Sequence, residues 1–230
     1  MKRVLVAEDE ATIRDFIVIN LKRVGYETAE ASDGKQALEI YEKEGGNFDV
    51  AILDIMMPEM DGIELCKELR KRSPGIGIIF LTAKTQEIDK ITGLMVGADD
   101  YVTKPFSPAE LMARVDTLYR RVSMNASPAA TDDEITLGEF TLNTKNRTFT
   151  KNGKPIVLTQ VEFQLIEYFF HNPDSALHRD EILAKIWGRD FYADKIVDVN
   201  IRRLRMKVEN DPSNPKHLVT VWAYGYKWVV

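Results

Sequence analysis

The first half of the chain alternates between short apolar runs and stretches in which apolar residues recur every three or four positions. The short runs predict five strands, at residues 2–7, 27–31, 49–53, 76–81 and 101–102. The longer stretches predict five helices, at residues 11–24, 34–44, 62–72, 87–96 and 107–121. Strands that alternate with helices form a parallel sheet covered on both faces. We therefore expect a doubly wound, five-stranded, flavodoxin-like α/β domain.

The second half follows a different order of elements. Alternating apolar residues predict short strands within residues 135–142 and 148–158 and a hairpin at residues 218–230. Between them, Thr159 and Glu162 match the capping box that opens a helix. Two more helices are predicted at residues 179–187 and 193–209. Strands, three helices and a final hairpin predict an α+β domain unlike the first.

A segment without periodicity, residues 123–133, separates the two patterns. It reads Ser-Met-Asn-Ala-Ser-Pro-Ala-Ala-Thr-Asp-Asp, which is small and polar. This composition is typical of a flexible linker. We therefore expect two domains, at residues 1–122 and 134–230.

Charge and composition narrow the class of protein. The 230 residues carry a formal net charge of −5, which argues against a protein that is basic throughout. The charge is uneven, because residues 1–123 hold 17 basic and 22 acidic residues whereas residues 134–230 hold 14 and 12. The single Cys66 argues against an internal disulfide or a multi-cysteine zinc site. No apolar run approaches the roughly 18 residues of a membrane span, so we expect a cytoplasmic protein.

Polar side chains with related chemistry follow four predicted strands of the first domain. Glu8 and Asp9 follow the first strand, Asp54 the third, Thr82 the fourth and Lys104 the fifth. The carboxyl ends of parallel strands meet at one edge of the sheet, so these side chains should converge. Together they suit Mg²⁺ and a phosphoryl group, with one aspartate as nucleophile. Taken singly, each acid is better explained as a solvated loop residue or a helix cap, whereas the acids together with Thr82 and Lys104 favour the site.

These residues carry a resemblance to a known family. Four segments are similar to the receiver domain of two-component response regulators: Glu8-Asp9, Asp54 to Gly62, Thr82-Ala83 and Lys104-Pro105-Phe106. The resemblance covers residues 1–122. It implies that Asp54 accepts a phosphoryl group from a sensor histidine kinase. It also implies that the protein is not an enzyme, beyond self-phosphorylation and self-dephosphorylation at this residue.

The resemblance assigns further roles at the same edge of the sheet. It implies a Mg²⁺ site formed by Glu8, Asp9, Asp54 and the backbone carbonyl of Met56. Thr82 and Lys104 would contact the phosphoryl group, and Tyr101 would follow Thr82 as an aromatic switch. Lys104-Pro105 would be a cis peptide bond. From the residues alone, Tyr101 is as well explained as a side chain packed on a strand.

Charged residues crowd the region from residue 87 to residue 121, and a solvated surface is their ordinary explanation. The resemblance to regulators of the OmpR/PhoB type implies instead a two-fold dimer face held by intermolecular ion pairs. The residues that match this face are Lys90, Ile91, Leu94, Asp99, Asp100, Glu110, Ala113, Arg114 and Arg121. We expect phosphorylation of Asp54 to favour this homodimer.

The third predicted helix of the second domain is strongly basic. Val197, Ile201, Leu204 and Val208 recur at helical spacing, which predicts one face packed on the core and the arginines on the other faces. Arginine bonds guanine in the major groove, and arginine or lysine binds phosphate, so this helix suits DNA. A solvated basic face, or a surface for an acidic protein, is the alternative.

The second domain also resembles a known family, the winged-helix effector domain of OmpR/PhoB-type transcription regulators. The similar residues are Leu158-Thr159, Glu162-Phe163, Val197-Asp198-Val199, Ile201 to Arg205, Thr220-Val221 and Gly225-Tyr226. The resemblance implies binding to double-stranded promoter DNA, and we count RNA polymerase as a further partner. The DNA-binding residues expected are Lys195, Asn200, Arg202, Arg203, Arg205, Lys207, Thr220, Trp222 and Lys227.

The wing departs from the family pattern at Trp222-Ala223, where Arg-Gly is frequent. This departure puts in question an arginine that enters the minor groove. Trp222 is expected to pack either on the sugar–phosphate backbone or on its own domain.

Taken together, the sequence favours a phosphorylation-controlled regulator of transcription. One alternative is an aspartyl-phosphate phosphatase or hydrolase that uses Asp54, although neither a further acid–base group nor a substrate domain is evident, and there is no P-loop. The other is an adaptor whose basic helix binds an acidic protein. The kinase, its stimulus, the DNA sequence, the target genes, the direction of regulation and the arrangement of the domains are not readable from the sequence.

Overall fold

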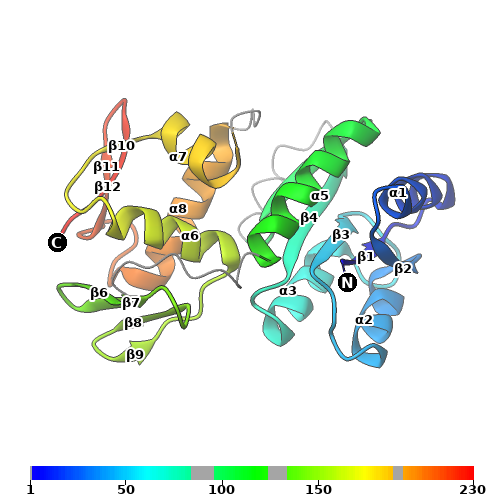
Figure 1. Ribbon diagram of the computed structural model, residues 1–230, viewed down its shortest axis with the longest axis horizontal. Coiled ribbons are helices and arrows are strands. Elements are labelled where there is room, and N and C mark those ends of the chain that lie inside the picture. The colour runs from blue at the N-terminus through cyan, green and yellow to red at the C-terminus, as the bar shows by residue number, and fades with distance from the viewer. Residues whose placement is uncertain (1, 84–95, 124–133, 189–193) are drawn as a thin grey trace. The chain divides into compact units, whose positions relative to one another are not determined.

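The computed structural model describes residues 2–83, 96–123, 134–188 and 194–230. Its contacts divide the chain into two compact units, residues 1–125 and 126–230, and each is described by itself (Figure 1). The predicted linker lies outside the described residues except for its first position, so the linker and the domain limits remain predictions.

The first unit is built on a five-stranded parallel sheet. Its strands are β1 (Arg3–Ala7), β2 (Glu27–Ala31), β3 (Val50–Asp54), β4 (Gly77–Ala83) and β5 (Asp100–Lys104). They lie in the order β2-β1-β3-β4-β5, so the strand order reverses at β1 and the predicted doubly wound sheet is confirmed. All five residues of β3 are buried, as expected for a central parallel strand covered on both faces.

Helices cover both faces of this sheet. They are α1 (Ala11–Arg23), α2 (Gly34–Lys43), α3 (Gly62–Arg72) and α5 (Pro108–Ser123). α1 packs beside α5, and α2 packs beside α3 (Figure 1). Asp33 and Asp61 cap α2 and α3, because their carboxylates accept hydrogen bonds from amides of the first helical turn at 2.8 and 2.7 Å. The helix predicted at residues 87–96 falls almost wholly outside the described residues.

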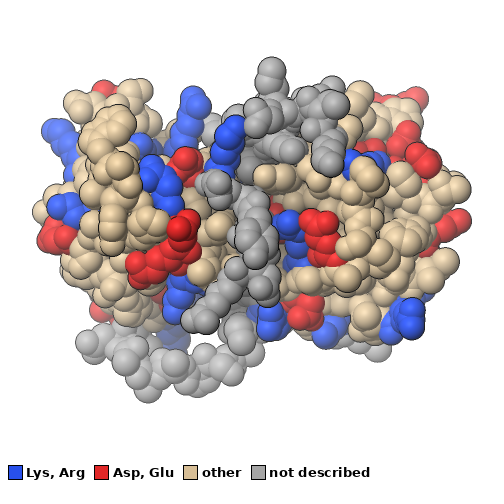
Figure 2. All heavy atoms as spheres, turned by 90° about the horizontal axis from the view of Figure 1, so that it is seen from above, with Lys and Arg blue, Asp and Glu red and all other residues tan. Residues whose placement is uncertain are grey.

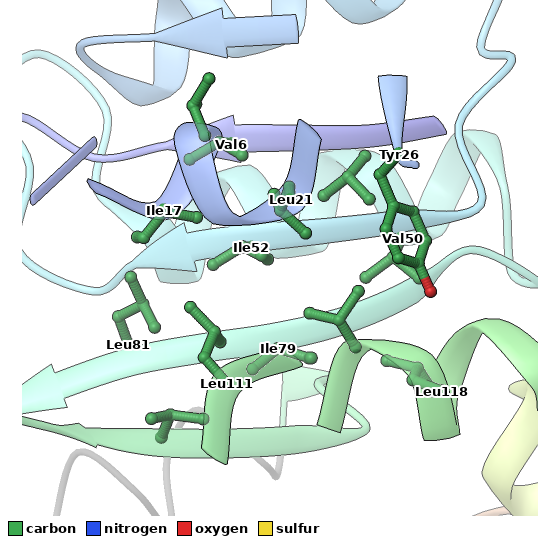
Figure 3. Close-up of a cluster of buried hydrophobic side chains, with 14 residues drawn as sticks. Val6, Ile17, Leu21, Tyr26, Val50, Ile52, Ile79, Leu81, Leu111 and Leu118 are labelled. Carbon is green, nitrogen blue, oxygen red and sulfur yellow. The ribbon is translucent and has the colours of Figure 1, made fainter. Parts of the chain in front are cut away.

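Aliphatic side chains form the core between the sheet and the helices α1 and α5 (Figure 3). Val6, Ile52 and Ile79 come from β1, β3 and β4 and have no exposed surface. Leu21 of α1 and Leu111 of α5 pack against them from the helical side. This packing holds the strands in register and so determines which side chains meet where the strands end.

The described residues of the second unit form two small antiparallel sheets and three helices. The first sheet consists of β6 (Glu134–Leu137), β7 (Phe140–Asn143), β8 (Thr148–Lys151) and β9 (Lys154–Pro155), in that order. The helices are α6 (Gln160–Phe170), α7 (Arg179–Ile186) and α8 (Asp194–Val208). The second sheet has the order β10-β12-β11, from β10 (Leu177–His178), β11 (Leu218–Val221) and β12 (Gly225–Trp228). The predicted strands, three helices and final hairpin are confirmed. β10 was not predicted, because two residues are too few to show an alternation.

Aromatic rings fill the core of the second unit. Phe140 stacks on Phe149 with ring centroids 5.6 Å apart, and Trp228 lies 5.1 Å from Phe140 and 5.0 Å from Phe170. These rings join the first sheet, the helix α6 and the terminal hairpin into one core. The capping box predicted for Thr159 and Glu162 is present at the start of α6.

The surface is mixed in charge. On the face drawn in Figure 2, acidic and basic side chains lie interspersed over both units. Within the described ranges, no helix combines the length and the apolar character needed to cross a membrane.

Candidate functional site

An acidic cluster lies at the carboxyl edge of the parallel sheet. Glu8 and Asp9 follow β1, and Asp54 is the last residue of β3. One carboxylate oxygen from each of the three side chains lies within 4.8 Å of the others. Glu8 and Asp54 are buried whereas Asp9 is exposed, so the cluster opens to solvent on one side. The convergence expected from the strand ends is therefore present.

Lys104 neutralises the buried part of this cluster. Its ammonium nitrogen lies 2.7 Å from a Glu8 carboxylate oxygen and 3.0 Å from Asp54 Oδ2. Burial raises the pKa of Glu8 to about 7, although Lys104 opposes that shift. Burial likewise raises the pKa of Asp54. The pKa of Lys104 would fall on burial, but the two carboxylates hold it above its ordinary value. One ammonium group thus pairs with two carboxylates, and their raised pKa values indicate that their anionic forms are incompletely stabilised. A second cation bound here would stabilise these anions further.

The other predicted residues of this site lie on the neighbouring strands. Thr82 is in β4 and is 2% exposed, and Tyr101 is in β5 and half-buried. The Met56 side chain is 65% exposed, and its backbone amide lowers the pKa of the Asp54 carboxylate, against the larger effect of burial. The predicted cis peptide bond between Lys104 and Pro105 is present.

Two residues that were not predicted hold the acidic cluster in place. The Arg14 guanidinium, on α1, donates a hydrogen bond to the carbonyl oxygen of Glu8 at 2.7 Å. Gly62 begins α3, and a Cβ atom at this position would lie 2.0 Å from the Asp54 carbonyl oxygen. A glycine directly after the capping residue Asp61 was the available signal for this close approach. Nothing in the spacing of Arg14 pointed to its contact.

A pocket of about 480 Å³ adjoins the cluster on the α1 side. It is lined by Thr12, Ile13, Phe16, Lys104, Pro105 and Phe106. Phe16 is 39% exposed, and Ile19 one turn further along α1 is 64% exposed. Apolar side chains therefore line a pocket beside the charged site.

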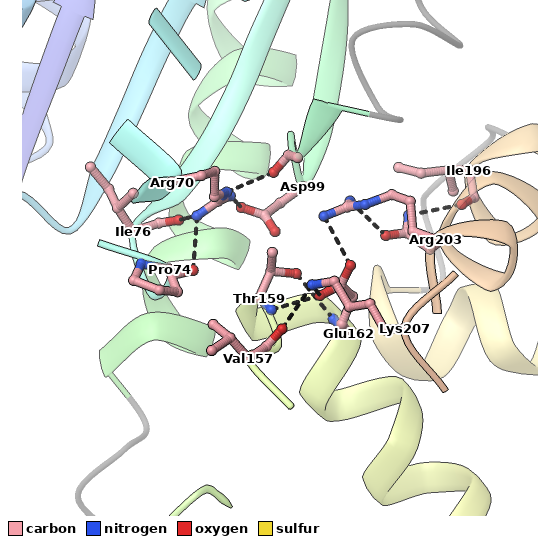
Figure 4. Close-up of polar contacts among 12 residues, drawn as sticks. Arg70, Pro74, Ile76, Asp99, Val157, Thr159, Glu162, Ile196, Arg203 and Lys207 are labelled. Carbon is pink, nitrogen blue, oxygen red and sulfur yellow. Dashed lines mark hydrogen bonds and ion pairs between the residues drawn. The ribbon is translucent and has the colours of Figure 1, made fainter. Parts of the chain in front are cut away.

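The structure corrects one residue of the predicted dimer face. Asp99 has no exposed surface, and its Oδ2 lies 2.5 Å from Arg70 and accepts a hydrogen bond from the Ile78 amide at 2.8 Å (Figure 4). The prediction that Asp99 lies on a dimer surface is therefore wrong, because this side chain joins α3 to β4 inside the unit. Arg70 also donates to the carbonyl oxygens of Gly97 and Pro74.

Of the remaining residues predicted for the dimer face, some lie among the residues that the structure describes and others do not. Asp100 is 4% exposed and pairs with Arg114 at 3.2 Å within the chain, and Arg114 also pairs with the exposed Glu110 at 3.1 Å. Ala113 is exposed on α5. Lys90, Ile91, Leu94 and the side chain of Arg121 lie outside the described residues.

The basic helix α8 buries more of its polar residues than predicted. Asn200 has no exposed surface, and its amide donates to the Ile196 carbonyl oxygen at 2.9 Å. Arg203 is 6% exposed and pairs with the buried Glu162 at 3.1 Å (Figure 4). The prediction that these two side chains face DNA is wrong, because both lie in the interior of the unit.

Lys207 is exposed, but its ammonium group reaches the same buried carboxylate. It pairs with Glu162 at 2.6 Å and donates to the Val157 carbonyl oxygen at 2.9 Å (Figure 4). Burial would raise the pKa of Glu162, but Arg203 and Lys207 hold it below its ordinary value. These charges therefore join α8 to α6. The exposed stripe of α8 consists of Lys195, Asp198, Arg202 and Met206.

The terminal hairpin is bonded to α8. Arg205 donates to the Leu218 carbonyl oxygen and to Thr220 Oγ1, both at 2.8 Å. Lys227 lies opposite Val219 in the hairpin and is half-buried. Trp222, at the hairpin tip, is 89% exposed, so it does not pack on its own domain.

Comparison with protein families assigns both halves of the chain. The response regulator receiver domain matches residues 4–116. The C-terminal domain of transcriptional regulatory proteins matches residues 153–228. The chain is 42% identical over 228 residues to the sensory transduction protein RegX3 of Mycolicibacterium smegmatis, with 99% of each chain covered. It is 40% identical, with the same coverage, to RegX3 of Mycobacterium tuberculosis strain H37Rv.

Solved structures share the arrangement of elements within the units. A RitR mutant aligns over 99% of both chains with a TM-score of 0.79 and 22% identity, which supports the fold alone. DrrB of Thermotoga maritima, described as an OmpR/PhoB homologue, aligns over 100% of both chains with a TM-score of 0.50 and 28% identity.

Proposed function

The chain belongs to the two-component response regulators of the OmpR/PhoB type and acts on transcription rather than as an enzyme, and on this premise we propose that Asp54 is its phosphoacceptor. The observation that carries the proposal is the position of Lys104. Its ammonium group bonds both Glu8 and Asp54 at the edge of the sheet where the strand order reverses. A carboxylate next to a fixed cation and a further acid is suited to receive a phosphoryl group.

In this function each residue of the pocket has a separate task. An Asp54 carboxylate oxygen forms the bond to phosphorus while the bond from phosphorus to the donor breaks. Lys104, already 3.0 Å from Asp54, neutralises charge on the incoming group. Thr82, buried on the neighbouring strand, supplies a hydroxyl, and Tyr101 on β5 moves with it. The donor is a phosphohistidine on a sensor kinase.

The acidic cluster fits a magnesium ion. Receiver domains bind Mg²⁺ in an acidic pocket, and the carboxylates of Glu8, Asp9 and Asp54 could hold one here. Hard oxygen ligands are those that Mg²⁺ prefers, and the raised pKa values of Glu8 and Asp54 are what a site short of cations produces. The carbonyl oxygen of Met56 completes the proposed set. Bound Mg²⁺ would neutralise phosphoryl oxygens.

The sensor kinase docks over the pocket next to Asp54. Support comes from the exposed apolar side chains of Phe16, Ile19 and Met56 and from the pocket beside Lys104. Exposed apolar surface around a polar site is typical of a protein-binding face. A kinase seated there would bring its phosphohistidine to a buried carboxylate and exclude water.

The second unit binds promoter DNA through α8. Lys195 and Arg202 lie on its exposed stripe, and Arg205 bonds Thr220 of the hairpin, which also carries Lys227. Lys207 lies at the rim, with its ammonium group turned to Glu162. An exposed basic helix is the element expected to enter the major groove.

Phosphorylation at Asp54 drives formation of a homodimer. Glu110, Ala113 and Arg114 supply the described part of its face, together with Asp100, Lys90, Ile91, Leu94 and Arg121. The pair between Asp100 and Arg114 is internal to the chain here, so dimerisation would exchange it for an equivalent pair with a second copy. Sedimentation with and without acyl phosphate and Mg²⁺ tests this step, and an unchanged monomer would contradict it.

The cellular setting follows from promoter binding. The regulator works in the cytoplasm, where promoter DNA is reached, and RNA polymerase is the partner through which bound protein acts. Residues 123–133 form the linker between a receiver domain at 1–122 and an effector domain at 134–230.

The experiment that tests the phosphoacceptor uses the full chain, an acyl phosphate and Mg²⁺. Intact-mass analysis should show one added phosphoryl group on the wild type and none on Asp54→Asn. Asp15→Asn, which alters an exposed acid on α1, is the matched control and should be phosphorylated normally. Phosphorylation of Asp54→Asn at the wild-type rate would refute the assignment.

A further inference from the structure

The pocket beside the acidic cluster shares one residue with it. Lys104 lines the pocket, and its ammonium group also pairs with Asp54 at 3.0 Å and with Glu8 at 2.7 Å. The other lining residues are Thr12, Ile13 and Phe16 from the start of α1, and Pro105 and Phe106 directly after β5. A small molecule that is held by Lys104 can therefore touch both the pocket and Asp54.

The pocket has a firm floor and an accessible rim. Ile13 and Phe106 are partly buried and pack against the hydrophobic core of the first unit. Phe16 comes from the opposite wall to Phe106, with ring centroids 6.4 Å apart and ring planes inclined by 46°. Phe16 is 39% exposed and Thr12 is also exposed, so these two side chains form the rim. Core packing therefore fixes the floor, while the rim stays open to a bound molecule.

The size and chemistry of the pocket suit a small molecule with one anionic end and one apolar end. Its volume of about 480 Å³ falls within the roughly 300–1,000 Å³ of small-molecule sites. Among the described residues that line it, Lys104 carries the charge, and Ile13, Phe16 and Phe106 offer apolar surface. Two phenylalanine rings favour a flat aromatic group, because aromatic rings gain from edge-to-face and offset contacts.

We propose that this pocket binds the leaving group of a small-molecule phosphodonor and selects acyl phosphates whose acyl group is aromatic. This inference deepens the proposed function and rests on Asp54 as the phosphoacceptor. In the transfer, an ionised Asp54 carboxylate oxygen bonds to phosphorus while the bond from phosphorus to the acyl oxygen breaks. The acyl oxygen keeps the electron pair, so an aromatic carboxylate is released and no proton is transferred.

The two ends of such a donor match the two parts of the site. The attacking and leaving oxygens lie on opposite sides of phosphorus, so the acyl group extends away from Asp54 while Lys104 neutralises the phosphoryl oxygens. An acetyl group would fill little of the pocket, whereas an aromatic ring buries apolar surface against Phe16 and Phe106. Because the proposed kinase surface includes this pocket, the small donor and the kinase are alternative donors for Asp54.

A comparison of two donors tests the selection. The full chain is incubated with Mg²⁺ and either benzoyl phosphate or acetyl phosphate, and intact-mass analysis follows the added phosphoryl group. Each second-order rate constant is divided by the rate of spontaneous hydrolysis of that donor, which removes the difference in intrinsic reactivity. The normalised constant should be roughly tenfold larger for benzoyl phosphate, with half-saturation at a lower concentration, because its ring is buried on binding. Equal normalised constants would overturn the proposal.

Two substitutions at the rim locate the selection in this pocket. Phe16→Ala removes an aromatic wall and Thr12→Phe fills the pocket with a ring, so both should bring the ratio of the two rate constants close to one. Val24→Ala is the matched control, because it shortens another exposed apolar side chain at the far end of α1 and should keep the wild-type ratio. A general disturbance of the site slows both donors equally and leaves the ratio unchanged, so an unchanged ratio in Phe16→Ala and Thr12→Phe would overturn the proposal.

Failure of this inference and failure of the proposed function give different results. Phosphorylation of Asp54 by both donors without preference would remove the leaving-group pocket and keep the phosphoacceptor. No phosphoryl group added to the wild type by either donor would remove both. The added mass also separates phosphoryl transfer from benzoyl transfer to an amine, and benzoyl transfer without phosphorylation would overturn the inference as well.

Discussion

Arg203 of α8 pairs with Glu162 of α6 at 3.1 Å, and neither side chain reaches the surface, with exposures of 6% and 0%. Their residues are 41 positions apart in the sequence, and Figure 4 shows the pair as the centre of a polar cluster. A buried ion pair contributes little net free energy compared with apolar packing, but breaking it by removing one partner is costly. The pair therefore holds α8 in one position on α6.

Glu162→Gln should destabilise the second unit by about 3–5 kcal/mol, because it leaves Arg203 buried without its counter-charge. Urea unfolding followed by tryptophan emission measures this unit alone, since the three tryptophans are Trp187, Trp222 and Trp228. Asp180→Asn is the control, because the Asp180 side chain is 82% exposed and its change should stay below about 1 kcal/mol. Equal effects of the two substitutions would contradict the role of the pair.

The same pair predicts how stability depends on pH. The folded pKa of Glu162 lies below its unfolded value of 4.5, so the unfolded chain takes up the proton first as the pH falls. The contribution of Glu162 is complete above about pH 5 and is lost as the pH falls through the unfolded value and then the folded one. The difference in unfolding free energy between the wild type and Glu162→Gln should therefore shrink in acid. A difference in unfolding free energy that stays constant from neutral pH into acid would contradict the proposed contribution of the Glu162 carboxylate.

Magnesium affinity should also fall as the pH falls, but in a higher pH range. The pKa of Glu8 is raised to about 7, and a metal-binding carboxylate must lose its proton. Mg²⁺ should bind roughly tenfold more weakly at about pH 6 than at about pH 8, because Glu8 is mostly protonated at the lower pH. Calorimetric titration in two buffers of different ionisation enthalpy would measure both the affinity and the released proton.

Two variants check that Glu8 is the group responsible. Glu8→Gln should make the remaining Mg²⁺ affinity nearly independent of pH in this range. Asp15→Asn, an exposed acid on α1, should keep both the affinity and the pH dependence of the wild type. Proton release that persists in Glu8→Gln would assign the titration to another group.

The sequence predicted the features of the fold and of the acidic site that depend on local hydrophobic pattern and on where strands end. Glu8, Asp54 and Lys104 were expected to meet because parallel strands end at one edge of a sheet, and they do. Arg203 was misplaced because its charge suggested an outer face. α8 has a second buried row, formed by Ile196, Asn200 and Arg203. Arg203 in this row pairs with Glu162 of α6, and the residue spacing within α8 does not reveal that partner.

Tertiary contacts account for the other differences. Asp99 was assigned to the dimer face from the resemblance to OmpR/PhoB-type regulators, yet its side chain is buried against Arg70 of α3. β10 consists of two residues that are strand only because they pair with β12. These features arise from partners distant in the chain, which periodicity does not report.

Gly62→Ala should disturb the phosphoacceptor although it touches no side chain of the pocket. The added Cβ would lie 2.0 Å from the Asp54 carbonyl oxygen and 3.1 Å from the Ile55 Cα, so the backbone that carries Asp54 must move. Alanine favours a helix over glycine by at most about 1 kcal/mol, and the gain is smaller at the first helical residue. The overlap costs more, roughly 1–3 kcal/mol or above. Both the stability of the first unit and the rate of phosphorylation by acyl phosphate should therefore fall.

Gly75→Ala supplies the matched control for this substitution. Gly75 has open space around its Cβ position, so alanine there should change the unfolding free energy by less than about 1 kcal/mol and leave phosphorylation unchanged. Far-UV circular dichroism reports the helices of both units and is used for both variants because the first unit contains no tryptophan. If Gly62→Ala is phosphorylated as fast as Gly75→Ala, the contact between α3 and the end of β3 does not position Asp54. A slower rate at unchanged helix content would place the effect at the carboxylate itself.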